Sequence, residues 1–225
     1  MDRLPLADRP IPSRPGCSPA TRTIKRWFDV LMSSFMLVIL APLMAVIAVL
    51  VRVTSGRPVL FRQERPGLGG RVFMLLKFRT MNAETDDRGL LLSDDLRLTG
   101  FGRFLRRTSL DELPQLWNVV KGEMSLVGPR PLLTEYMDRY SPEQARRHEV
   151  RPGITGLAQV HGRNLLSWEE RLKMDVWYVD NLRLRLDLGI LWKTLVQVLK
   201  QDGISARNHA SMPPFVGSGR SGGSS

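Results

Sequence analysis

The sequence predicts a mainly helical α+β fold with a re-entrant membrane helix, amphipathic helices at the membrane interface and a small β-hairpin. Three observations predict it: an uncharged apolar segment over residues 30–51, two β-prone runs around a glycine cluster, and three Ser-x-x-Glu/Gln patterns that begin helices. The 225 residues are 24% charged and 43% hydrophobic, as in an ordinary folded domain. We expect a flexible leader over 1–21, a single domain over 22–216 and a flexible tail over 217–225.

The apolar segment carries no charged residue between Asp29 and Arg52. At about 1.5 Å per residue, a helix of this length just crosses a hydrocarbon core about 30 Å thick. Both flanks are basic, and because positive charge favours the cytoplasmic side, a straight span leaves one flank misplaced. Pro42 lies at the centre and favours a kink. We therefore expect a helix that enters the bilayer, bends and returns. A plain transmembrane anchor with an incidental proline explains the segment about as well, and a buried core helix explains it least.

A β-hairpin is predicted next. The runs Val59-Leu60-Phe61 and Val72-Phe73-Met74-Leu75 are rich in strand-forming residues and flank Pro66-Gly67-Leu68-Gly69-Gly70. The spacing of these glycines matches neither a P-loop nor a dinucleotide-binding fingerprint. The cluster is therefore interpreted as a turn.

Three capping boxes begin helices in the second half of the chain: Ser109 to Glu112, Ser141 to Gln144 and Ser167 to Glu170. The second helix should end before Pro152, and the third should run to about Leu182.

An apolar stripe follows, which Gly203 should end. It consists of Leu188, Leu191, Trp192, Leu195 and Leu199. Helical spacing and the opposing lysines allow either a core helix or a helix in the membrane surface.

The formal net charge of +11 indicates a polyanionic neighbour, which is nucleic acid, anionic lipid or a phosphate-bearing substrate. Nucleic acid fits least, because the charge is spread along the chain and the apolar segment would be unexplained. The only cysteine, Cys17, lies in the proline-rich leader. An intramolecular disulfide is therefore excluded, and a reducing, cytoplasmic setting fits best.

Asp111 and Glu112 are the candidate catalytic residues. Glu112 alone could close a plain capping box, with Asp111 complementing the helix dipole. However, Arg106 and two further arginines precede the pair, and nearby cations keep a carboxylate ionised and nucleophilic. The free N–H groups of a helix start also attract phosphate. The combination indicates phosphoryl chemistry, in which a divalent ion offsets repulsion between Asp111 and the substrate.

Two more segments suit phosphate binding. In Gly128-Pro129-Arg130-Pro131 the prolines fix the backbone around one forked guanidinium, although an ordinary rigid turn has the same pattern. Arg151 and Arg163 lie on a glycine-rich stretch that either covers a nucleotide diphosphate or forms a solvated loop.

Several stretches carry a resemblance to a known family: KRWFDV, the apolar run with its central proline, FRQERPGLGGRVFMLLKFRTM, LSDDLRLTGFGRFLRRTSLDELPQLWNVVKGEMSLVGPRPLL and VRPGITGLAQVHGRN. From Lys25 to about Phe215 the chain resembles the small monotopic bacterial phosphoglycosyl transferases. These sugar transferases begin glycan assembly on a polyprenyl phosphate carrier.

The resemblance implies a Mg²⁺-dependent, two-step reaction at the cytoplasmic face of the bacterial inner membrane. Asp111 would attack the β-phosphate of a UDP-sugar, releasing UMP and keeping the phosphosugar, which polyprenyl (undecaprenyl) phosphate then accepts. Glu112 would help to hold the metal or manage a proton. The expected substrate-binding residues are Lys77, Arg106, Pro129, Arg130, Arg151 and Arg163.

One departure from the family concerns the membrane break, where the usual Ser-Pro is replaced by Ala41-Pro42. The turn should therefore be held less firmly. The short length and continuous match resemble the members that load diacetylbacillosamine phosphate, although no residue here specifies the sugar. Inner-membrane lipids and downstream glycosyltransferases are the expected partners. The alternative function is a catalytically silent membrane-surface scaffold that binds anionic lipid.

Overall fold

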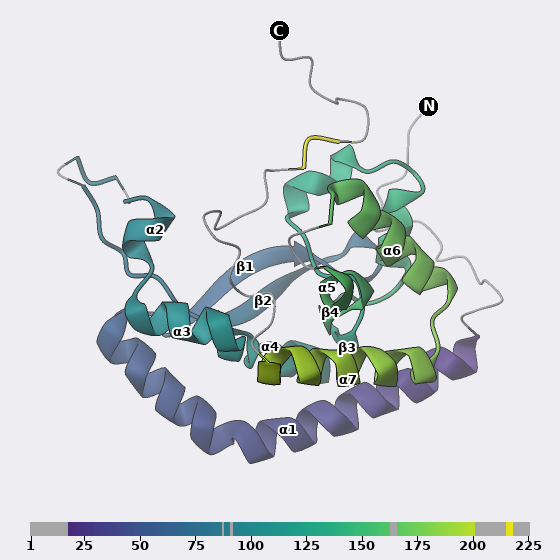
Figure 1. Cartoon of the computed structure of the whole chain (residues 1–225), viewed down its shortest axis with the longest axis horizontal. Helices are drawn as coiled ribbons and strands as arrows, with labels where there is room; N and C mark the ends of the chain where they lie inside the picture. Colours follow the sequence, from purple (N-terminus) through teal and green to yellow (C-terminus); the bar gives the residue numbers. More distant parts are fainter. Residues whose placement is uncertain (1–17, 87, 91, 163–165, 201–214, 218–225) are drawn as a thin grey trace, which may run out of the picture.

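The computed structural model describes residues 18–86, 88–90, 92–162, 166–200 and 215–217. A long bent helix, α1 (Pro19–Thr54), lies along one side of a globular part that contains the other elements (Figure 1). Ser18 caps its start, because the Ser18 hydroxyl accepts a hydrogen bond from the Thr21 N–H at 3.1 Å. The helix thus begins within the stretch expected to be leader, and it continues through Pro42.

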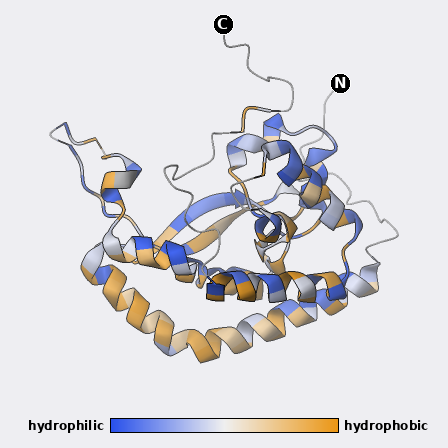
Figure 2. Cartoon of the chain, in the orientation of Figure 1, coloured by the Kyte–Doolittle hydropathy of each residue, from blue (hydrophilic) through white to orange (hydrophobic). Residues whose placement is uncertain are grey.

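Among the described residues, α1 is the one helix long and apolar enough to cross a membrane, and only 11% of its most apolar window is buried. Figure 2 shows that the middle of α1 is hydrophobic along its length, and Leu31, Phe35, Val38 and Val46 are among its exposed apolar side chains. The buried core helix, the least favoured interpretation, is therefore wrong. Both halves of α1 nevertheless contact the globular part: Asp29 bonds to Ser125, and Val51 shares a buried cluster with Leu105. The bend brings both ends of α1 to the same side (Figure 1).

The predicted hairpin is confirmed. Strands β1 (Leu60–Pro66) and β2 (Val72–Phe78) pair antiparallel, with Phe61 opposite Lys77. The connecting 3-10 turn η2 (Leu68–Gly70) uses glycines at φ 64° and 79°, a region that glycine enters at little cost.

Asn118 fixes the hairpin to helix α4 (Gln115–Lys121). Its side chain accepts from the Leu76 N–H at 3.1 Å and donates to the Met74 carbonyl at 2.8 Å. Because Lys77 follows directly in β2, these bonds also set the position of its side chain.

Most of the other elements lie around the hairpin, whereas α2 lies on an arm that projects from the globular part (Figure 1). They are α2 (Asp94–Arg97), α3 (Gly100–Thr108), η3 (Leu110–Glu112), β3 (Ser125–Val127), η4 (Thr134–Arg139), η5 (Gln144–Glu149), β4 (Gly153–Thr155), α5 (Leu157–His161), α6 (Trp168–Asp180) and α7 (Leu184–Lys200). Strands β3 and β4 pair in parallel, a contact that no sequence pattern predicted.

The three predicted helix starts have different outcomes. The Ser167–Glu170 capping box is present and begins α6. Ser141 and Gln144 exchange the expected bonds at 3.0 and 3.2 Å, but the segment that follows is the 3-10 helix η5. The Ser109–Glu112 box is wrong: Ser109 has φ 57° and ends α3 instead, so its hydroxyl does not cap the next helix.

Helix α7 (Leu184–Lys200) presents four of the five residues of the predicted apolar stripe outward. Leu188, Trp192, Leu195 and Leu199 are each about half exposed or more, whereas Asp187 and Ile190 point inward and are buried. Leu191, the fifth residue of the stripe, is partly buried and packs against the core. Of the two interpretations left open, the core helix is therefore wrong for the four exposed residues and holds for Leu191. The expected stop at Gly203 lies outside the described residues.

Buried charged and polar groups fasten α1 to the globular part. Lys25 forms an ion pair with Asp187 of α7 at 2.6 Å, and Asp187 also accepts from the Tyr178 hydroxyl at 2.7 Å. One turn along α1, Asp29 accepts from the Ser125 hydroxyl at 2.7 Å. Breaking such buried pairs leaves an uncompensated charge, so α1 and α7 are held in a fixed relation.

Candidate active site

Asp111 and Glu112 lie in η3, the single turn between α3 and α4. The left-handed conformation of Ser109 reverses the chain at the end of α3. As a result, both carboxylates point into the globular part, where Asp111 is only 7% exposed. Glu112 is consequently free of the local capping role that the sequence pattern suggested.

Glu112 is held by two cations from different parts of the chain. Its Oε1 atom accepts from the Lys77 ammonium at 2.7 Å and from the Arg130 guanidinium at 2.8 Å. Burial raises the pKa of Glu112, but Arg130 and Lys77 outweigh it and lower the pKa to about 2. Glu112 is therefore ionised and fixed, and its Oε2 atom is left for another ligand.

Asp111 differs from Glu112 both in its partners and in the direction of its pKa shift. Its carboxylate makes no hydrogen bond or ion pair with any residue that the structure describes. Burial and the adjacent charge of Glu112 raise its pKa to about 6, against the opposing effect of Lys77, Arg130 and Arg106. A carboxylate pair whose environments separate the two pKa values is typical of a catalytic site.

Arg106 approaches the pair from α3. Its Nε atom donates to the Thr80 hydroxyl at 3.0 Å, which ties the guanidinium to the end of β2. Gly102 allows this approach, since a Cβ atom there would lie 1.9 Å from the Thr80 carbonyl oxygen. The predicted residues Lys77, Arg106 and Arg130 are thus brought together around Asp111.

The loop that presents Arg130 is fixed from both sides. Pro129 accepts from the Gly153 N–H at 3.0 Å, and Gly128 donates to the Thr155 carbonyl at 2.9 Å. A Cβ atom at Gly153 would lie 2.1 Å from the Gly128 nitrogen, so this contact requires glycine. Pro129 therefore acts through its backbone and its position in the loop.

Arg147 was missed by sequence reasoning. It donates to the Arg130 carbonyl oxygen at 2.7 Å and pairs with Asp175 at 2.8 Å, and both charged side chains are almost completely buried. No motif marks Arg147 in the sequence, because its partners come from a loop and from α6.

Other predicted residues lie elsewhere. Arg151 donates to the Gly122 carbonyl oxygen at 2.8 Å and has Arg26 and Asp29 among its charged neighbours, so it lies beside α1. Arg163 falls outside the described residues. Ala41 and Pro42 are exposed in the middle of α1.

The donor set suits a metal that is bound largely through its substrate. The part of the chain that the structure describes contains no group of three or more His, Cys, Asp or Glu side chains able to enclose an ion. However, the Asp111 carboxylate and the Glu112 Oε2 atom are both unengaged. Mg²⁺ commonly uses one or two carboxylates together with substrate phosphates, so these residues fit it.

The pattern that defines the bacterial sugar transferase family matches residues 20–201. The chain is 52% identical over 196 residues to the uncharacterized sugar transferase EpsL of Bacillus subtilis, covering 87% of this chain and 97% of the relative. It is 42% identical over 202 residues to an undecaprenyl-phosphate galactose phosphotransferase of Salmonella typhimurium, covering 82% of this chain but 42% of that relative. A UDP-glucose:undecaprenyl-phosphate glucose-1-phosphate transferase of Caulobacter vibrioides is 43% identical over 188 residues, covering 79% and 70%.

Proposed function

The chain belongs to the bacterial sugar transferase family, and we propose that it transfers a phosphosugar from a UDP-sugar to polyprenyl phosphate, releasing UMP. One observation supports this reaction above the others. A buried, unpaired carboxylate, Asp111, lies beside a second carboxylate, Glu112, that two cations hold in place. The names of relatives such as the galactose and glucose phosphate transferases support the classes of donor and acceptor.

In the first step, the Asp111 carboxylate attacks the β-phosphorus of the UDP-sugar. A bond forms between the aspartate oxygen and phosphorus, and the bond from that phosphorus to the bridging oxygen breaks, so that UMP leaves. Arg130 and Arg106 lie close enough to Asp111 to affect its pKa. The same charges stabilise the negative charge that develops on the phosphoryl oxygens.

In the second step, a phosphate oxygen of polyprenyl phosphate attacks the phosphorus on Asp111. The aspartate–phosphorus bond breaks, the carboxylate is regenerated and polyprenyl diphosphate sugar is formed. Because Glu112 is ionised and held by Lys77 and Arg130, it keeps its position through both steps.

Mg²⁺ is proposed as the cofactor, with Asp111 and the free Oε2 atom of Glu112 as its protein ligands. When bound, it supplies positive charge that reduces repulsion between the carboxylates and the diphosphate. The other cations are fixed by the fold, since Lys77 and Arg130 bond to Glu112 and Arg106 bonds to Thr80.

The proposed setting is the cytoplasmic face of the bacterial inner membrane, with α1 as a re-entrant helix and the exposed stripe of α7 at the interface. The bend of α1 and the contacts of both its halves with the same globular part support this topology. Tags at residue 5 and residue 220 should then both be accessible from the cytoplasm. Accessibility from opposite sides of the membrane would reject the re-entrant helix.

The reaction is tested by measuring UMP release from a panel of UDP-sugars with Mg²⁺ and polyprenyl phosphate. We expect one or more sugars to support turnover, and Asp111→Asn to abolish it. Asp138→Asn is the control, because Asp138 is an exposed carboxylate on η4. A membrane scaffold without catalytic activity would release no UMP with any sugar.

A further inference from the structure

Arg130 has two guanidinium neighbours that the sequence motifs did not mark. Arg65 comes from the end of β1 and Arg171 from α6. Burial lowers the pKa of the Arg65 guanidinium, and repulsion from Arg130 lowers it further. Burial also lowers the pKa of Arg171, with repulsion from Arg130 and Arg147 acting against attraction by Asp175. Three arginines from separate parts of the chain therefore lie within electrostatic reach of one another.

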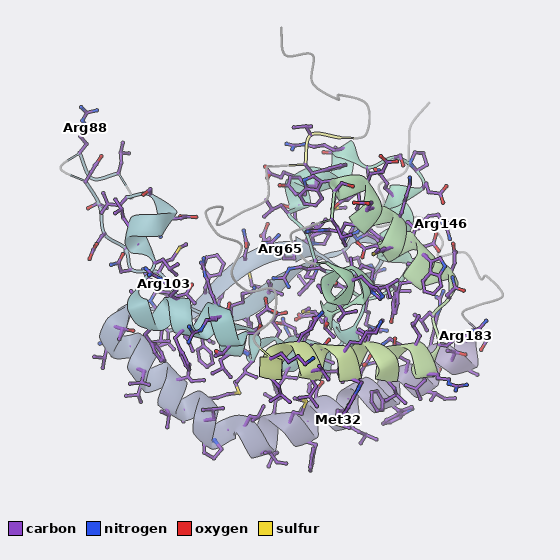
Figure 3. The ribbon with its side chains drawn as sticks, viewed as in Figure 1. Met32, Arg65, Arg88, Arg103, Arg146 and Arg183 are labelled. Carbon is purple, nitrogen blue, oxygen red and sulfur yellow. The ribbon has the colours of Figure 1, made fainter. Side chains whose placement is uncertain are left out.

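The partly buried guanidinium of Arg65 has few hydrogen-bond partners within the protein. One Nη atom donates to the Gln63 side-chain oxygen at 2.6 Å, whereas Nε is buried without any hydrogen-bond partner. Besides Arg130, the groups that affect the pKa of Arg65 are the phenols of Tyr136 and Tyr140, and no carboxylate is among them. Among the described residues, no carboxylate pairs with Arg65. Figure 3 shows Arg65 inside the outline of the globular part, whereas Arg88 and Arg183 extend from its edge.

The charges around Arg130 do not balance. The electrostatic neighbours linked through Arg130 and Asp111 include six cationic side chains, which are Arg65, Lys77, Arg106, Arg130, Arg147 and Arg171, and three carboxylates, which are Asp111, Glu112 and Asp175. Glu112 and Asp175 are already paired, with Lys77 and Arg130 and with Arg147 respectively. The excess of positive charge therefore suits the binding of a phosphate group.

We propose that Arg65, which the strand register places on the same face of the hairpin as Lys77, is a further phosphate-binding residue of the reaction centre. The assignment deepens the proposed function and depends on it for the identity of the phosphate. A forked guanidinium with unused donors suits bidentate contact with phosphate oxygens. Arg171, which stacks over Trp168 at 5.2 Å, contributes positive potential from a fixed position.

Two phosphate groups of the reaction can occupy this position. The UDP-sugar carries an α-phosphate next to the phosphorus that reacts, and the acceptor carries the phosphate of polyprenyl phosphate. Both have the same chemistry at the guanidinium. Steady-state kinetics with each substrate varied in turn distinguishes them.

The test compares Arg65→Gln with Arg62→Gln. Arg62 lies on the same strand but is exposed, so its loss removes an equal charge without removing the buried donor. We expect Arg65→Gln to raise KM for one substrate about tenfold or more, with kcat changed less than about threefold. A rise for the UDP-sugar identifies the donor phosphate, and a rise for polyprenyl phosphate identifies the acceptor phosphate. Arg62→Gln should leave both values unchanged.

Calorimetric titration with inorganic phosphate gives a second readout that does not need turnover. Arg65→Gln should weaken phosphate binding relative to the wild-type chain, and Arg65→Lys, which keeps the charge, should restore part of it. Unchanged phosphate affinity in Arg65→Gln, or a loss of kcat with both KM values unchanged, would overturn the assignment.

If the wild-type chain turns over no UDP-sugar, the proposed function fails, while this titration still decides whether Arg65 binds phosphate. If Arg65→Gln does not fold, unchanged phosphate affinity in a folded Arg65→Lys variant likewise counts against the assignment.

Discussion

The guanidinium of Arg147 donates a hydrogen bond to the main-chain carbonyl of Arg130 at 2.7 Å. The same side chain pairs with the buried carboxylate of Asp175. Arg130 in turn donates to Glu112. The buried ion pair of Arg147 with Asp175 thus fixes the main chain at Arg130, whose side chain reaches Glu112. Arg147 is therefore a positioning residue.

Replacing Arg147 with lysine should reduce kcat/KM about tenfold, because lysine keeps the charge opposite Asp175 but loses the fork that also reaches Arg130. Arg146→Lys is the matched control: the neighbouring Arg146 also forms ion pairs, with Glu149 and Asp180, but none with the site. Its kcat/KM should stay within about twofold of wild type. Equal losses in the two variants would show that Arg147 contributes only to stability.

Gly102 and Gly100 provide a second matched pair. A Cβ atom at Gly102 would lie 1.9 Å from the Thr80 carbonyl oxygen, whereas nothing lies within 4 Å of one at Gly100. Gly102→Ala should therefore cost at least about 2 kcal/mol of unfolding free energy and displace Arg106 from Thr80. Gly100→Ala should be neutral or gain up to about 1 kcal/mol. Thermal unfolding measures both, and equal stability of the two variants would contradict the close contact.

Much of the fold was predictable because it depends on local pattern. The uncharged run between Asp29 and Arg52 became the exposed part of α1, and the two β-prone runs became β1 and β2. The Ser167 box begins α6 because both of its bonds join residues three apart. In each of these cases the physical cause lies within a few residues of the element.

The site was predicted only in part, because its geometry depends on distant contacts. Ser109 matched a capping pattern, yet tertiary packing places it in the left-handed region and turns Glu112 towards Lys77 and Arg130. The parallel pairing of β3 with β4 joins strands of three residues, too short for a periodic signal. Arg65 and Arg147 gain their significance only from neighbours elsewhere in the chain.

The pH dependence of kcat/KM should follow Asp111. Its pKa is raised to about 6, and the nucleophile must be ionised to attack. We therefore expect kcat/KM to fall about tenfold per unit of pH below that value and to reach a plateau above it. A profile that is flat between pH 5 and pH 7 would contradict this assignment. Glu112, with its pKa lowered to about 2, should add no step in this range.

Asp111→Asn should make the protein more stable at neutral pH. The pKa of Asp111 is raised from 3.8 to about 6 in the folded protein, so the folded state binds its proton more strongly than the unfolded state. The stabilisation that the protonated Asp111 carboxyl contributes is present below pH 3.8 and is lost as pH rises through about 6. Above that pH the folded protein contains an ionised, buried carboxylate. Asparagine removes this cost of about 1–3 kcal/mol. Thermal unfolding at pH 7.5 should show the gain, and a less stable Asp111→Asn variant would count against an unpaired carboxylate.

The most direct measurement is intact-protein mass spectrometry after incubation with UDP-sugar and Mg²⁺ but without polyprenyl phosphate. We expect the wild-type mass to increase by one phosphosugar, fragmentation to place it on Asp111, and polyprenyl phosphate to remove it. Asp138→Asn should form the same adduct and Asp111→Asn should form none. An adduct on another residue, or UMP release by Asp111→Asn at the wild-type rate, would contradict the role of Asp111 as the nucleophile.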